Sequence, residues 1–230
     1  MAPAIEIQDL VVEFPGRPGP VRALRGLTLA VEEGQVFGFL GPNGAGKTTA
    51  MHVLLGFIRA TSGVARVFGT DVRQAIARRR IGYLPEHPDT YRFLTGRELL
   101  TVAGHLFLLR GRALQRRIDV LVEDVGLGAA IERRVAGYSR GMLQRLGLAQ
   151  ALIQDPDLVI LDEPTSGFDP LGRLSVRALI ASLRARGKTV FFSSHELSEV
   201  ELVCDHIGIV VEGRVVAGGT VSELVPAGER

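Results

Sequence analysis

One glycine-rich segment constrains this chain more than any other: Gly41-Pro42-Asn43-Gly44-Ala45-Gly46-Lys47-Thr48-Thr49. It fits the pattern G-x-x-x-x-G-K-[ST], in which glycines let the backbone curl so that several N–H groups point at an anion. Residues 36–40 before it are typical of a short buried strand. Residues 49–57 are typical of a helix whose positive N-terminus would face phosphates. A chance match is expected in fewer than roughly one chain in a hundred of this length. The segment therefore predicts a strand–loop–helix site for the triphosphate of a nucleotide.

The last residues of the segment supply the chemistry that a triphosphate needs. Lys47 can reach the outer phosphates as a compact cation, and the Thr48 hydroxyl can be a ligand of Mg²⁺. We therefore expect residues 41–49 to bind the phosphates and Thr48 to hold part of a Mg²⁺ site.

The composition narrows the class of protein. The 230 residues are 46% hydrophobic, which favours one globular domain, or one domain with an insertion, over a disordered chain. No apolar run approaches the ~18 residues that span a bilayer. Residues 1–6 lack the basic-then-apolar order of a secretory signal. Cys204 is the single cysteine, which rules out an internal disulfide, favours the cytosol and predicts a small buried apolar side chain.

The distribution of charge gives no sign of a nucleic-acid partner. The net charge is +2, and arginines cluster only briefly, at residues 78–80, 116–117 and 133–134. Such short, scattered clusters are better explained as solvated helix surfaces, because a nucleic-acid face needs a continuous basic patch. We expect no nucleic-acid partner.

The order of the predicted elements indicates an α/β fold. Residues 5–14 and 23–31 alternate as strands do, on either side of a Gly/Pro-rich turn, and a further strand pair is expected at 65–67 and 81–84. From about residue 95 to 154 the apolar spacing is helical. After Pro156 strands and helices alternate again, which implies a mainly parallel sheet with covering helices and a helical insertion. The expected strands there are 158–161, 189–192, 206–211 and 214–217, and the expected helices are 171–186 and 197–203.

Two adjacent carboxylates follow the apolar strand at 158–161. Asp162 is placed to hold Mg²⁺ through water, because Mg²⁺ takes few direct carboxylates and keeps much of its hydration. Glu163 would point to the opposite side of the strand end, where a general base could polarise the water that attacks the γ-phosphate. Asp-Glu can follow many surface strands by chance. The loop upstream and residues 164–170 behind make chance a poor explanation here.

Three classes of nucleotide-binding protein compete for this pattern. A GTPase needs N-K-x-D to read guanine, and Asn43 is the only asparagine in the chain, so that motif is absent. A small-molecule kinase would usually place basic lid residues over the phosphates, and no arginine-rich lid is compelling. The third class leaves the base mostly to stacking and completes the phosphate site from another subunit. That class fits best.

Five motifs together resemble those of the ATP-binding subunit of an ABC (ATP-binding cassette) transporter, over essentially all 230 residues. Two are the loop at 41–49 and the Asp162-Glu163 pair. Residues 138–142, Tyr-Ser-Arg-Gly-Met, stand where the family has its Leu-Ser-Gly-Gly-Gln signature. Residues 167–170 stand at the family's D-loop, and His195 stands at its switch histidine.

The resemblance implies a P-loop NTPase (RecA-like) core with an N-terminal antiparallel β subdomain and an inserted α-helical subdomain. A single nucleotide-binding domain would span residues 1–230, with its catalytic core in 1–90 and 155–230 and the helical signature subdomain in 91–154. Two copies, or one copy and a second cassette, would enclose two ATP molecules head to tail. They would drive a separate integral membrane permease, with export favoured, from the cytoplasmic face of the cell membrane.

The resemblance also implies roles for the residues around the phosphates. Lys47 and the loop amides would bind phosphate, Thr48 and Asp162 would hold Mg²⁺, and Glu163 would activate water. His195 would contact the γ-phosphate and link it to Glu163.

Further residues would act across the dimer. Asp169 of the other copy would meet His195. Ser139, a good N-cap in its own right, and Gly141 would act on the ATP bound by the other copy, because the family aims that helix N-terminus at the opposite γ-phosphate.

Three positions depart from the family pattern. Arg140 replaces the first signature glycine and Met142 the glutamine; Arg140 could strengthen anion attraction across the dimer or extend into solvent. Glu86 stands where the family's Q-loop glutamine senses Mg²⁺ and the membrane subunit. A carboxylate could still coordinate the metal but has no hydrogen bond to donate. The combination is similar to ATPase subunits that pair with type-2 exporter permeases.

The remaining predictions concern the adenine base, the permease and the wider function. Phe14 stands near the family's adenine-stacking aromatic, where stacking is worth ~1–3 kcal/mol per base; the alternative is a core aromatic at a strand end. Residues 92–94 are candidates for the surface that contacts the permease. The alternative function is a non-transport ABC ATPase of DNA repair, translation or iron–sulfur assembly. Long coiled-coil insertions and tandem cassettes, which would mark the first two, are absent.

Overall fold

The computed structural model describes residues 2–88 and 90–224. Met1, Asp89 and residues 225–230 lie outside the described residues. These positions belong to the predicted catalytic core, 1–90 and 155–230, so that part of the prediction is not described. The strands are β1 Ile5–Phe14, β2 Val21–Val31, β3 Val36–Leu40, β4 Ser62–Val67, β5 Thr70–Asp71, β6 Ile81–Leu84, β7 Leu158–Leu161, β8 Thr189–Ser194, β9 His206–Val211 and β10 Arg214–Thr220. The α-helices are α1 Lys47–Leu54, α2 Gly96–Leu106, α3 Gly111–Asp124, α4 Arg140–Leu152, α5 Pro170–Ala185, α6 Leu197–Val200 and α7 Val221–Leu224.

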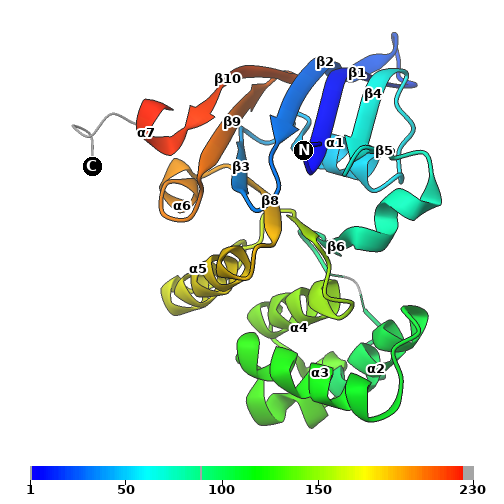
Figure 1. Cartoon of the computed structure of the whole chain (residues 1–230), viewed down its shortest axis with the longest axis vertical. Coiled ribbons are helices and arrows are strands. Elements are labelled where there is room, and N and C mark those ends of the chain that lie inside the picture. Colours follow the sequence, from blue (N-terminus) through cyan, green and yellow to red (C-terminus); the bar gives the residue numbers. More distant parts are fainter. Residues whose placement is uncertain (1, 89, 225–230) are drawn as a thin grey trace.

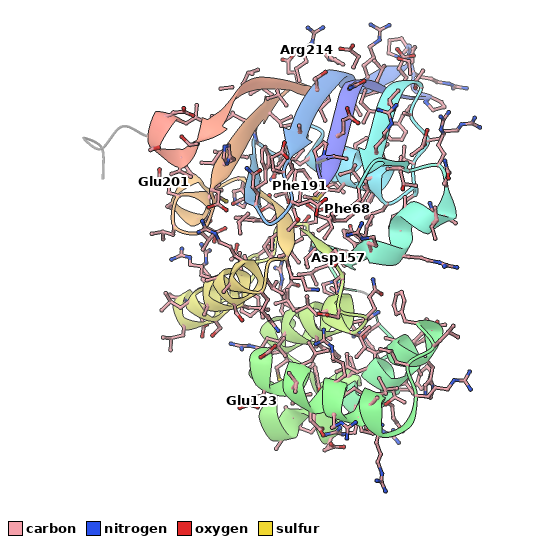
Figure 2. All side chains as sticks on the ribbon, in the orientation of Figure 1. Phe68, Glu123, Asp157, Phe191, Glu201 and Arg214 are labelled. Atoms are coloured by element: carbon pink, nitrogen blue, oxygen red, sulfur yellow. The ribbon has the colours of Figure 1, made fainter. Side chains whose placement is uncertain are left out.

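A six-stranded sheet runs through the middle of the molecule in the order β10-β9-β3-β8-β7-β6. The pairs β9–β3, β3–β8, β8–β7 and β7–β6 are parallel, and only β10 runs antiparallel to its neighbour. Every residue of β3, β7 and β8 is buried, because helices or the second sheet cover both faces of these strands. Figure 2 shows Phe191 of β8 at the centre of this packed layer.

A second, four-stranded sheet has the order β2-β1-β4-β5, with antiparallel pairing. The alternating burial along β1 and β2 points one face of this sheet inward. That face and α1 share one hydrophobic cluster with Phe39 and Phe191 of the first sheet. The helix α1, which follows the glycine-rich loop, is therefore packed between the two sheets.

The helices α2, α3 and α4 gather at the end of the molecule opposite the four-stranded sheet (Figure 1). The helix α2 begins at Thr95 with a complete capping box to Glu98, as a Thr-x-x-Glu pattern predicts. The helix α4 leads back to the six-stranded sheet, where Gln154 Nε2 donates to Ile81 O at 2.6 Å. The limits of this helical group as a subdomain, residues 91–154, stay a prediction.

The expected strand pair at 65–67 and 81–84 is wrong. Both segments are strands, but β4 pairs with β1 and β5 in the antiparallel sheet, while β6 pairs with β7 in the parallel sheet. The two strands are near in sequence, yet each lies in a different sheet.

Several element limits also differ from expectation. The first helix starts at Lys47 inside the glycine-rich loop and ends at Leu54, before the predicted limit of 57. The helix at 197–203 is reduced to Leu197–Val200, and the last strand extends to Thr220. Within residues 2–88 and 90–224, none of the helices is both long enough and apolar enough to cross a bilayer.

Candidate functional site

The carboxyl ends of four parallel strands bring the predicted site residues to one edge of the six-stranded sheet. The loop at 41–49 follows β3, Glu86 comes shortly after β6, Asp162 follows β7 and His195 follows β8. Parallel strands end at the same edge of a sheet, which is where open α/β sheets bind ligands. The register places Leu40 beside Ser194 and Leu161 beside Phe192, so the loops meet.

The glycine-rich loop curls as its pattern predicts. Gly46 caps α1 at φ 102°, a left-handed conformation that favours glycine, and a Cβ there would meet Ala23 O at 2.7 Å. A Cβ on Gly41 would meet Val210 O at 2.3 Å. Because Gly46 has no side chain to cap the helix, the first N–H groups of α1 face the hollow that the loop surrounds. Unpaired N–H groups and the helix dipole make this hollow an anion site.

Lys47 lies at the floor of the loop, only 6% exposed. Its Nζ donates to Gly41 O at 2.6 Å and to Pro42 O at 3.3 Å, and it stands 3.4 Å from Glu163 Oε1. The last contact is a charge pairing without hydrogen-bond geometry, since Glu163 Oε1 has no hydrogen-bond partner among the described residues. The loop carbonyls therefore fix the ammonium group beside a buried carboxylate.

Thr48 and Asp162 meet directly across the site. Thr48 Oγ1 donates to Asp162 Oδ2 at 2.8 Å, and Ser193 Oγ donates to Asp162 Oδ1 at 2.6 Å. Asp162 is 2% exposed, so these bonds hold its carboxylate in one orientation. Burial and then the charge of Asp162 raise the pKa of Tyr83, which lies on the neighbouring strand β6.

Glu163 is held by both its backbone and its side chain. Its φ of 47° is rare for a residue other than glycine, and such conformations gather at functional sites. Its N–H donates to Ser193 Oγ at 2.9 Å, and its Oε2 lies 2.8 Å from His195 Nδ1. One carboxylate oxygen is thus engaged by histidine. The other, Oε1, is buried with no hydrogen-bond partner among the described residues, so it can accept one from water or substrate.

These residues surround a hollow of about 270 Å³. Its wall is formed by Ala23, Pro42, Asn43, Gly44, Ala45, Gly46, Lys47, Thr48, Thr49, Glu86, Asp162 and Glu163. Glu86 therefore lies beside the phosphate loop, as its predicted place implies, with its carboxylate partly exposed.

The donor set of this hollow fits a Mg²⁺ ion. A threonine hydroxyl and a carboxylate are already in contact, and Glu86 adds a second carboxylate on the wall. Oxygen donors of this kind, few in number and leaving room for water, are what Mg²⁺ prefers. Ligation by Thr48, Asp162 and Glu86 stays a prediction.

Phe14 lies outside this wall. It ends β1, is paired with Val21 and is 37% exposed. Its neighbour strand β2 reaches the hollow at Ala23. Phe14 is thus a partly exposed aromatic at the end of β1, and its contact with adenine stays a prediction.

The signature residues lie in a different place. Ser139 caps α4 by accepting from Met142 N–H at 3.3 Å, and both Ser139 and Gly141 line a separate hollow with Phe168 and Asp169. They are absent from the wall around Lys47. Contact of Ser139 and Gly141 with nucleotide held by another subunit stays a prediction.

Arg140 is exposed to solvent, and its side chain also bonds within its own chain. Its Nη2 donates to Ser166 Oγ at 2.9 Å, and its side chain covers Gly167 so closely that a Cβ there would meet Nε at 2.4 Å. The arginine therefore ties the first turn of α4 to the D-loop of the same chain.

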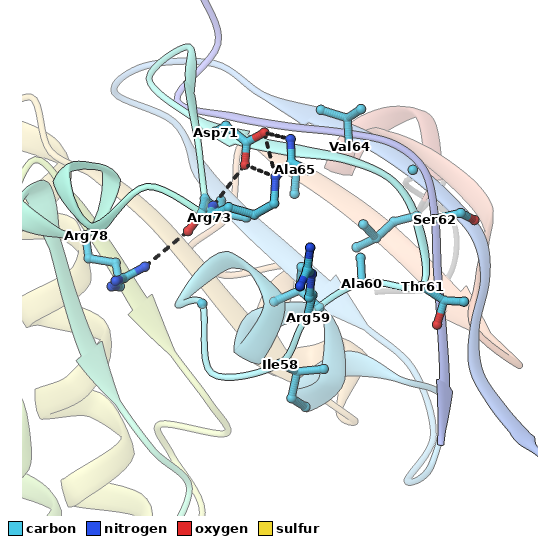
Figure 3. A pocket seen from close by; sticks show the side chains of 15 residues that line it. Ile58, Arg59, Ala60, Thr61, Ser62, Val64, Ala65, Asp71, Arg73 and Arg78 are labelled. Carbon is cyan, nitrogen blue, oxygen red and sulfur yellow. Dashed lines mark hydrogen bonds and ion pairs between the residues drawn. The ribbon is translucent and has the colours of Figure 1, made fainter. Parts of the chain in front are cut away.

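A larger cavity, of about 730 Å³, lies between α1 and the antiparallel sheet (Figure 3). Three of its charged groups are already bonded: Arg73 Nε donates to Asp71 Oδ1 at 3.0 Å, and Arg78 Nη1 donates to Val72 O at 3.1 Å. Hydrogen bonds from Arg73 hold the pKa of Asp71 below its ordinary value. Although this cavity is larger, none of the residues that line the hollow around Lys47 lines it.

Two residues that the sequence did not single out complete the network. Ser193 joins Asp162 to Glu163, and Glu199 is a carboxylate only 5% exposed behind the site. Serine at the end of a buried strand is a weak signal, because many such serines bond only to nearby backbone.

Comparisons with known proteins agree with this geometry. Residues 24–166 match the family described as ABC transporter. The chain is 48% identical over 207 residues to an uncharacterised ABC transporter ATP-binding protein of Nostoc sp., covering 89% of this chain and 62% of that protein. It is 42% identical over 219 residues to a bacitracin transport ATP-binding protein of Bacillus licheniformis, covering 94% of this chain and 69% of that protein. The chain thus spans less than two thirds of the Nostoc relative.

A solved ATP-binding subunit of an ABC transporter has the same fold, with a TM-score of 0.85 and 30% identity over 96% of this chain and 91% of that one. The α/β P-loop fold expected from the sequence is confirmed by this likeness.

Proposed function

Because this chain belongs to the ABC transporter family, we propose that it binds and hydrolyses ATP and so drives transport through a separate membrane permease. The observation that carries the proposal is the cluster of Lys47, Thr48, Asp162, Glu163 and His195 at one edge of the sheet, beside the glycine-rich loop that lines the same hollow.

Binding would depend on the loop and its lysine. The N–H groups at the start of α1 and the Lys47 ammonium offer donors to the β- and γ-phosphates of ATP. Thr48 and Asp162 would hold Mg²⁺, with Glu86 as a further oxygen ligand. When bound, the ion would neutralise the charge that develops on the phosphates. Phe14 would stack on the adenine base.

Hydrolysis would depend on Glu163. A carboxylate with one buried oxygen unbonded can take a proton from attacking water, which fits a general base. His195 Nδ1, 2.8 Å from Glu163 Oε2, keeps that carboxylate turned toward the hollow, and its half-exposed ring can also reach a γ-phosphate.

A second copy would complete the site. Ser139 and Gly141 lie outside the wall around Lys47 and near Asp169, on an exposed surface. Head-to-tail pairing would place this surface over the phosphates held by the partner and give a dimer with two ATP molecules between its subunits. The partner could be a second copy of this chain or a different cassette.

The permease partner and the membrane location rest on the relatives. The Bacillus licheniformis relative is named for bacitracin transport, and a Paraburkholderia xenovorans relative is named for Nod factor export. These names favour export by this chain, from the inner face of the membrane. In the region suggested for permease contact, Phe93 is 70% exposed and Leu94 packs against the core. A non-transport role would fit the same ATP site, and copurification with a polytopic membrane protein distinguishes the two.

Replacement of Glu163 tests the enzymatic part of the proposal. Glu163→Gln keeps the size of the side chain and removes the base, so phosphate release should fall by about 10²–10⁴-fold while ATP still binds. Glu212→Gln is the matched control, because Glu212 is an exposed partner of Arg25 and should leave turnover unchanged. Turnover by Glu163→Gln at the wild-type rate would show that the base is another group.

A further inference from the structure

The buried carboxylate of Glu199 lies behind the proposed site. It is hydrogen-bonded to three segments of the chain that also carry proposed site residues. Glu199, in α6, accepts hydrogen bonds on Oε2 from Thr165 Oγ1 at 2.5 Å and from Ser194 Oγ at 3.2 Å. Its Oε1 accepts from Arg173 Nη1 at 2.9 Å. Both oxygens are thus satisfied, as a buried charge requires.

Each partner of Glu199 lies next to a proposed site residue in the chain. Thr165 is two residues after Glu163, in the turn that leaves β7, and Ser194 directly precedes His195 at the end of β8. Arg173 lies in the first turn of α5, and its N–H donates to the carbonyl of Asp169, which caps that helix. One carboxylate therefore joins the turn after β7, the end of β8 and the first turn of α5.

The contacts around Arg173 strengthen this junction. Its Nη1 donates also to Glu196 Oε2 at 2.8 Å, and hydrogen bonding to Glu196 is the main cause that raises the pKa of Arg173. Glu196 in turn donates its N–H to Ser194 Oγ at 3.0 Å. The segment on both sides of His195 is thus bonded to the start of α5.

Resting on the function proposed above, we propose that Glu199 is a positioning residue for ATP hydrolysis, which sets the geometry of Glu163 and His195 through Thr165 and Ser194. Glu199 itself does not line the hollow around Lys47. Its loss should therefore lower the rate of the chemical step and leave ATP binding by the loop at 41–49 intact.

The test compares three variants with the wild-type chain by ATP affinity, by kcat from phosphate release and by the midpoint of thermal unfolding. Glu199→Gln removes the charge that holds Arg173, and Thr165→Val removes one donor while keeping the side-chain shape. Because small misplacements of reacting groups are costly, both should lower kcat by about 10- to 100-fold. The Kd for ATP should stay within about threefold of the wild-type value, as expected when an interaction serves the transition state alone.

Asp205→Asn is the matched control for a purely structural carboxylate. Asp205 accepts from Val36 N–H at 2.9 Å and pairs with Arg184, at the opposite end of β3 from the phosphate loop. Its replacement should lower the unfolding midpoint and leave kcat unchanged at temperatures where the chain is folded.

A wild-type kcat for both Glu199→Gln and Thr165→Val, whatever their unfolding midpoints, would overturn the positioning role. If Glu199→Gln does not fold, Thr165→Val decides alone. Failure of the proposed function looks different: the wild-type chain itself would then release no phosphate, and both proposals would fall together. Loss of turnover in Glu163→Gln but in neither Glu199→Gln nor Thr165→Val would refute only the inference about Glu199.

Discussion

Ser193 is the residue whose replacement most directly tests the buried network behind the site. It is the penultimate residue of β8 and has 0% exposure; it donates to Asp162 Oδ1 at 2.6 Å and accepts from the N–H of Glu163 at 2.9 Å. Ser193→Ala removes only the hydroxyl and leaves these two groups buried without that partner.

The expected cost follows from these two bonds. A hydrogen bond to a charged group contributes about 1.5–3 kcal/mol, and a buried N–H left unpaired costs about 1–3 kcal/mol. Together they predict a loss of about 3–5 kcal/mol in the free energy of unfolding. In a chain of this size 1 kcal/mol shifts the melting temperature by about 2–4 °C, so the midpoint should fall by about 6–20 °C.

Urea and thermal unfolding followed by circular dichroism measure this loss. Ser175→Ala is the control: its Oγ donates at 3.1 Å to Leu171 O on the exposed side of α5, so its removal should change stability by less than about 0.5 kcal/mol. If Ser193→Ala unfolds within that same margin of the wild-type chain, the reasoning about the Asp162–Ser193–Glu163 network is refuted.

Two further predictions concern residues outside this network. Arg140→Ala removes the hydrogen bond to Ser166, so amide hydrogen exchange in residues 165–168 should become severalfold faster while exchange in β8 stays unchanged. Unchanged exchange in residues 165–168 would mean that the Arg140–Ser166 bond does not hold this turn. Burial raises the pKa of the Cys204 thiol, so little thiolate exists in the folded chain near pH 8, and a disulfide reagent should modify Cys204 much faster in urea than in buffer. Equal rates would contradict the burial of Cys204.

The sequence predicted the parts of the site that follow from local pattern. Residues 41–49 determine a loop and helix almost by themselves, since glycine conformation and the helix N-terminus are local properties. The alternation of strands and helices after Pro156 likewise predicted which carboxylates would reach the sheet edge.

What the sequence could not supply depends on strand order. A strand pair was expected at 65–67 and 81–84, where both segments are strands; β4 and β6 nevertheless lie in different sheets, which their closeness in sequence could not show. The links from Glu199 to Thr165 and Ser194 depend on β7 and β8 being adjacent. The contact of Arg140 with Ser166 joins segments 26 residues apart, and spacing alone left its position open.

The molar mass of Glu163→Gln, measured by light scattering with ADP or with ATP and Mg²⁺, tests the central claim that this sheet edge is half of an ATP site. If the sheet edge is half of an ATP site, the mass should double with ATP and not with ADP. It should not double when Ser139→Glu, which sets a carboxylate against the phosphates, is added to Glu163→Gln. A mass that stays that of one chain while ATP is bound would show that the site does not need a second subunit.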